Sequence, residues 1–78
     1  MSSKAKQKAA LGIIWKAFGF NKSEIARACD IDSAAVRGWF NRGRISAIGA
    51  IKLEKDHRLK GIITKEQMRP DVEEWFGI

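Results

Sequence analysis

The stretch that decides the fold lies at residues 21–41 and reads NKSEIARACDIDSAAVRGWFN. It opens with the start signal of a helix, because Asn21 is a favoured N-cap residue and Glu24, three positions later, completes a capping box. The helix predicted from this signal covers residues 22–29.

A second helix start follows within a few residues. Asp30 stands at a turn position that needs a positive φ, where aspartate is among the few tolerated substitutes for glycine. Asp32 is the next N-cap, and the helix that it begins covers residues 33–41 and ends before Gly43. A hydrophobic staple is expected at each of the two starts: Phe20 with Ile25, and Ile31 with Val36.

Two short helices joined by a tight turn are a candidate helix-turn-helix. Ala26 is small enough to allow close approach where the two helices cross. Five residues are expected to form the shared apolar seam: Ile25, Cys29, Ile31, Val36 and Trp39. Cys29 is therefore predicted to be a buried structural thiol rather than a redox sensor.

The rest of the chain is helical in pattern as well. Further helices are predicted over residues 3–18 and 46–56, and a short one begins after the N-cap Thr64 and ends before Pro70. Gly19 ends the first of them. The apolar stripe of this first helix consists of Leu11, Ile14, Trp15 and Phe18.

Glu54 falls in the same arc of the fourth helix as Ala50 and Ile51, so half burial is expected. A half-buried carboxylate needs a cationic partner. Arg27 and Arg42 are both candidates for that role.

Seventy-eight residues suffice for one domain, so we expect a single all-α unit over 1–78, with the motif at 21–41 and a tail at 71–78. The chain has one cysteine and one histidine, which excludes an internal disulfide and leaves a structural zinc site without ligands. No catalytic arrangement of side chains is present. We therefore expect a protein that is not an enzyme and that takes no metal, cofactor or small-molecule ligand.

The apolar runs are far shorter than the roughly 20 residues that span a bilayer. The basic N-terminus is not followed by the apolar region of a secretory signal. Both observations, together with the single cysteine, predict a cytoplasmic protein with no membrane partner.

The net charge of +6 is concentrated in the first part of the chain. Through Arg44, nine Lys or Arg residues stand against three acids, whereas six stand against six from Ile45 onward. A one-sided basic balance is typical of a polyanion binder. Together with the candidate helix-turn-helix, this basic balance predicts double-stranded DNA as the partner.

The helix predicted over residues 33–41 has two unlike faces at roughly 100° per residue. The bulky apolar arc holds Ala35, Val36, Trp39 and Phe40. A major groove admits a helix whose other face is small and carries a few long donors. The predicted base-contacting residues are Ser33, Ala34, Arg37 and Asn41. Arg37 suits a bidentate contact to guanine, and Ala34 suits a thymine methyl group.

Four further residues are predicted to hold DNA phosphates: Asn21, Lys22, Arg42 and Arg44. Asn21 and Lys22 stand at the N-terminus of the first motif helix, where free backbone N–H groups favour anions. Arg42 and Arg44 would grip the DNA backbone beyond the groove. The alternative for the three cations is plain solvated surface charge.

The motif, residues 25–39, resembles the helix-turn-helix of lambdoid-phage Cro repressors and is similar to the related YdaS-like bacterial regulators. The likeness extends over residues 18–71. It implies a compact five-helix, lambda-repressor-like fold and a small phage or prophage repressor that binds a near-palindromic operator as a dimer. The chain departs from the family pattern at Asp30, where glycine is preferred, and at Gly38, where a longer polar residue is common.

Two other functions stay open at this point. An antitoxin or activator of the YdaS-like kind would share the same fold, and no motif separates it from a repressor. A protein of another class, a basic helical module that meets an acidic protein partner, would share the same charge distribution.

The resemblance also implies pairing, because one recognition helix covers too few base pairs for useful specificity. We expect a weak homodimer that is completed on DNA. Its predicted interface lies in the segment from Ile62 to the C-terminus and includes Trp75 and Phe76. The alternative is that these two aromatic residues fold back over Trp15 or Ile63 and close the core.

Overall fold

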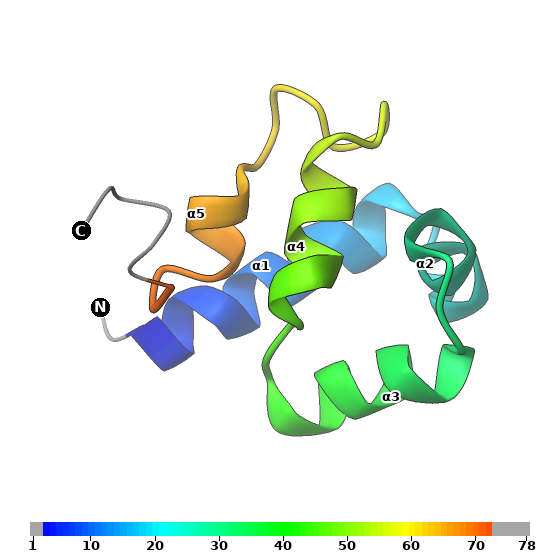
Figure 1. Ribbon diagram of the computed structural model, residues 1–78, viewed down its shortest axis with the longest axis horizontal. Coiled ribbons are helices and arrows are strands. Elements are labelled where there is room, and N and C mark those ends of the chain that lie inside the picture. Colours follow the sequence, from blue (N-terminus) through cyan, green and yellow to red (C-terminus); the bar gives the residue numbers. More distant parts are fainter. Residues whose placement is uncertain (1–2, 73–78) are drawn as a thin grey trace.

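Five helices make up the part of the chain that the computed structural model describes, residues 3–72 (Figure 1). They are α1 (Ser3–Ala17), α2 (Lys22–Cys29), α3 (Ser33–Arg42), α4 (Ala47–Glu54) and α5 (Lys65–Met68). These described residues contain no strand. The predicted all-α fold with five helices is confirmed, and the bounds of α2 agree with the prediction residue by residue.

The local signals act where they were expected. The Asn21 side chain accepts hydrogen bonds from the N–H groups of Ser23 and Glu24, and Asp32 caps α3 in the same way. Asp30 has a φ of 54°, as the turn requires. At α5, Thr64 and Gln67 form the reciprocal capping box.

The staple expected between Phe20 and Ile25 is wrong. Gly19 and Phe20 both have a positive φ, 65° and 60°. This double turn directs Phe20 outward, where it is 62% exposed and its ring meets Trp15 edge-on at 5.2 Å. Ile25 is instead fully buried. The Glu24 carboxylate, expected to complete the capping box, pairs with Arg27 at 3.0 Å.

The core lies between α1 and the four other helices. α2 and α3 pack on each other, α4 packs on α2, and α5 closes the far end against α1 and α4 (Figure 1). The largest fully buried side chains come from every part of the fold: Ile14, Ile25, Val36, Ile45, Leu53, Leu59 and Met68. Cys29 is buried with them, and burial raises the pKa of its thiol to about 11. The prediction of a buried thiol in the seam is confirmed.

Two expectations about buried faces need correction. Trp15 belongs to the apolar stripe by spacing, but it is 36% exposed, because its ring covers the edge of the core where it meets Phe20 and Phe40. Ala35 is exposed rather than part of the apolar arc of α3. The buried face of α3 is narrower than predicted and rests on Val36 and Trp39.

Glu54 is half-buried as expected, but its partner is neither Arg27 nor Arg42. It accepts a hydrogen bond of 2.8 Å from the backbone N–H of Lys65 and lies 3.7 Å from the ammonium of the same residue. Lys65 is the first residue of α5, so the carboxylate satisfies an N–H group at that helix start and ties α4 to α5.

No helix among the described residues combines the length and the apolar character that crossing a bilayer requires.

Candidate nucleic-acid interface

The outer side of α3, the helix that follows the turn, is accessible. α3 lies along the lower edge of the molecule in Figure 1. Val36 and Trp39 point into the core. The exposed residues are Ala34, Ala35, Arg37, Asn41 and Arg42, with Ser33 and Gly38 half-buried between them. All four predicted base-contacting residues therefore lie on the accessible side, and Ala35 and Arg42 share it with them.

A hollow of about 390 Å³ lies where the starts of α2 and α3 meet. Its lining is Trp15, Gly19, Phe20, Asn21, Lys22, Ser23, Ser33 and Arg37. The structure thus brings two predicted phosphate-contacting residues, Asn21 and Lys22, beside two predicted base-contacting residues, Ser33 and Arg37.

The backbone N–H groups at the start of α2 are less available than predicted. Asn21 Oδ1 accepts from the N–H groups of Ser23 and Glu24 at 3.0 and 3.3 Å. Both N–H groups are therefore already hydrogen-bonded, and the positive charge in this hollow comes chiefly from Lys22 and Arg37. The role of Asn21 is to shape the helix start.

Lys22 is held in place by aromatic rings. Its ammonium lies 5.0 Å from the ring centre of Phe40 and 5.7 Å from that of Trp15. A cation over aromatic faces is attracted by their negative π surfaces. The stem of Lys22 is half-buried. Its charge therefore stands at a defined place at the entrance of the hollow.

The other end of α3 adjoins α1. Two hollows of about 270 and 450 Å³ lie there, and both are lined by Arg42, Gly43 and Lys4. Asn41 and Lys8 line the smaller one. Lys4 and Lys8 were not among the predicted site residues. Their spacing could have identified them, because Lys4 and Lys8 share one helical stripe with Leu11 and Trp15. Lys6 lies on another side of the helix.

Arg44 is tied to the end of the described chain. Its Nη2 donates to Asp71 Oδ2 at 3.0 Å. Asp71 also accepts from Arg69 Nε and Nη2 at 2.8 and 3.0 Å, and from Gln7 Nε2 at 3.3 Å. The pKa of Asp71 is lowered from 3.8 to about 2, mainly because Arg69 donates hydrogen bonds to its carboxylate. A phosphate at Arg44 would share this guanidinium with a charged carboxylate.

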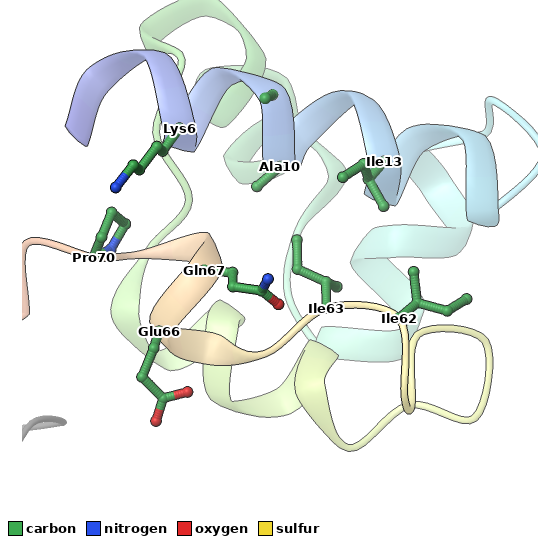
Figure 2. Close-up of a pocket in the computed structure, with 9 residues that line it drawn as sticks. Lys6, Ala10, Ile13, Ile62, Ile63, Glu66, Gln67 and Pro70 are labelled. Atoms are coloured by element: carbon green, nitrogen blue, oxygen red, sulfur yellow. The ribbon is translucent and has the colours of Figure 1, made fainter. Parts of the chain in front are cut away.

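An apolar groove of about 490 Å³ lies apart from these basic hollows, between α1 and α5. Figure 2 shows Ala10 and Ile13 on α1 facing Ile62 and Ile63, which precede α5. Ile62, a predicted interface residue, is 60% exposed and Ile13 is 44% exposed. The other two predicted interface residues, Trp75 and Phe76, lie outside the described residues.

A family model described as "Bacterial toxin YdaS" matches residues 17–75, well over half of the chain. The match starts at the last residue of α1 and includes α2 to α5 in full. No curated protein and no solved structure matches the chain. The resemblance to YdaS-like proteins is confirmed, and the more specific likeness to Cro repressors stays a prediction.

Proposed function

Because the chain belongs to the bacterial toxin YdaS family, small prophage-associated proteins of helix-turn-helix-like type, we propose that it is a sequence-specific double-stranded DNA-binding transcriptional regulator. Within that class we propose a repressor of the Cro type, which reads the major groove with α3. The observation that carries the proposal is the accessible side of α3, small in its middle and flanked by cationic hollows at both ends.

The dimensions of α3 suit this role. A ten-residue helix is about 15 Å long, and the major groove of B-DNA is about 12 Å wide. A helix of this length in the groove brings both of its ends near a phosphate wall. Cations at both ends, and small side chains between them, are what such docking requires.

The proposed roles follow from these positions. Ser33, Ala34, Arg37 and Asn41 contact base edges. Lys22, with Asn21 shaping the helix start, holds phosphates on one side of the groove. Arg42, Arg44, Lys4 and Lys8 stand on the other side. The last two lysines extend the predicted phosphate set.

A second candidate is favoured by the concentration of cationic side chains in the first 44 residues. In this alternative the basic surface binds an acidic protein partner rather than a duplex. Both functions depend on salt, so salt dependence alone does not separate them. Sequence preference does, because only base contacts distinguish one duplex from another.

The test is selection of bound sequences from a random duplex pool with the full chain, followed by affinity measurements on the enriched duplex. A repressor, an activator and a DNA-binding antitoxin all predict enrichment of one short motif. Reporter transcription from a promoter that contains the motif then separates repression from activation. Uniform, sequence-blind recovery of duplexes would contradict the proposal and favour the acidic-partner alternative.

We further propose that two copies bind together, since proteins with this motif commonly read two half-sites about one helical turn apart. The exposed isoleucines Ile13 and Ile62 flank the apolar groove, which lies between α1 and α5 and shares no lining residue with the basic hollows beside α3. A second copy of the chain is the occupant that a near-palindromic operator would call for. Trp75 and Phe76 belong to the same proposed interface.

A further inference from the structure

We propose that Arg42 reads a base, with its side chain folded back across Gly38 onto the groove face. This inference rests on the proposed function and changes the role of one residue within it. Arg42, at the end of α3, was assigned to the DNA backbone beyond the groove. The structure instead points its guanidinium to the place where a base-reading side chain of residue 38 would lie.

Gly38 lies halfway along α3, on its accessible side. At roughly 100° per residue it falls between Asn41 on one flank and Arg42 on the other. Glycine has no side chain, so this position beside the predicted base-contacting residues lacks a donor of its own.

The Arg42 guanidinium fills this place. A Cβ atom built on Gly38 would lie 3.0 Å from Arg42 Nη1, 3.4 Å from Nη2 and 3.5 Å from Cζ. The whole planar group thus lies against the Gly38 backbone, one helical turn before its own Cα atom. Long helical side chains lean toward the N-terminus in this way, and residues four apart are neighbours on the helix surface.

The charge of Arg42 is also uncommitted within the described chain. Its neighbour Arg44 is paired with Asp71 at 3.0 Å. No carboxylate among residues 3–72 forms an ion pair with Arg42. A planar guanidinium with five donors matches the O6 and N7 acceptors of guanine in the major groove. The proposed ligand of Arg42 is therefore a guanine edge, at a base pair neighbouring the one that Arg37 reads.

The test compares sequence selection from a random duplex pool for the wild type and three variants. Arg42→Lys keeps the charge but removes the bidentate fork. Gly38→Ala keeps all charges and crowds the guanidinium with a new methyl group at 3.0 Å. Arg27→Lys is the matched control, because it makes the same exchange at an exposed residue of α2 that has no place in the proposed interface. Thermal unfolding followed by circular dichroism checks each fold, and Gly38→Ala is expected to raise Tm because alanine favours a helix.

We expect Arg42→Lys to reduce the preference for guanine at one position by about tenfold, the lower part of the range for a bidentate base contact. Gly38→Ala should give a smaller reduction at the same position, and Arg27→Lys should leave every preference unchanged. An Arg42→Lys variant with the preferences of the wild type would overturn the proposal and return Arg42 to the phosphate set. A wild type that selects no motif would instead contradict the proposed function itself.

Discussion

Gly49 of α4 lies so close to Trp39 of α3 that a Cβ atom on Gly49 would stand 2.5 Å from Trp39 Cη2 and 2.7 Å from Cζ2. Real Cβ atoms do not approach a ring so closely, so the indole occupies the space that a side chain would take. Trp39 is the largest side chain that anchors α3 in the core. The absence of a side chain at Gly49 therefore helps to set the position of the proposed recognition helix.

Gly49→Ala is accordingly expected to lower the free energy of unfolding by about 1–3 kcal/mol, as overpacking of a core does. Gly12→Ala is the matched control. Gly12 lies inside α1 with nothing within 4 Å of an added Cβ, so this variant is expected to gain about 0.5–1 kcal/mol. Urea unfolding measures both. A Gly49→Ala protein as stable as the Gly12→Ala protein would show that Trp39 moves aside at no cost.

Lys4 and Lys8 are expected to contact phosphates, because they line the hollows at the end of α3. In a Lys4→Ala, Lys8→Ala variant, the slope of log K against log salt should become shallower by about 0.9 for each phosphate that is no longer neutralised. The control variant, Lys16→Ala with Lys55→Ala, removes the same charge from exposed positions that line none of these hollows. Equal slopes for the two variants would show that only net charge matters.

Arg37 is expected to read a base, because it lies on the accessible side of α3 beside the hollow at its start. Arg37→Ala should weaken binding to the selected duplex by about 1–3 kcal/mol and relax the preference at one base pair. Affinities for duplexes that differ at single positions measure this. A uniform decrease on all duplexes would place Arg37 on the DNA backbone.

The local start and stop signals could be predicted from the sequence because they act over a few residues. Asn21, Asp32, Thr64 and the αL residue Asp30 each perform the task that their side chains predict. These signals set the bounds of the helices, and the 3.6-residue period then indicated most of the core.

The features that could not be predicted depend on how the helices come together. Glu54 accepts a hydrogen bond from a backbone N–H group eleven residues away. Lys4 and Asn41 line the same hollow only because α1 passes the end of α3. The outward turn of Phe20 needs two successive positive φ values, one of them at a residue that rarely adopts it. Among the candidate site residues, the predicted faces agree with the structure, and the position of Arg42 over Gly38 is new.

Asp71 is expected to stabilise the fold at neutral pH, because it joins Arg44, Arg69 and Gln7. Its pKa in the folded protein, about 2, lies below the ordinary value of 3.8, so this contribution is present above about pH 4 and disappears as pH falls toward 2. Asp71→Asn should lower the free energy of unfolding at pH 6 by about 1 kcal/mol. The difference from the wild type should shrink between pH 4 and pH 2. A difference that is independent of pH would mean that packing, not charge, is responsible.

Ile62 is expected to contribute to pairing of two copies. Ile62→Asp places a charge in the apolar groove and should shift sedimentation toward the monomer and reduce cooperative binding to a duplex with two half-sites. A Trp75→Ala, Phe76→Ala variant tests the other part of the predicted interface. Lys60→Gln, two residues away, lowers the net charge by the same one unit and is the control for charge alone. Folded variants that still pair as the wild type does would exclude this surface.

The most direct test of sequence-specific DNA binding is the ratio of two affinities of the wild-type chain. One is for the duplex enriched by selection, and the other is for a duplex of the same length and composition with its bases shuffled, at the same physiological salt. We predict a ratio of about 10³ or more, the lower bound for specific DNA recognition. Equal affinities for the two duplexes would contradict the proposed function.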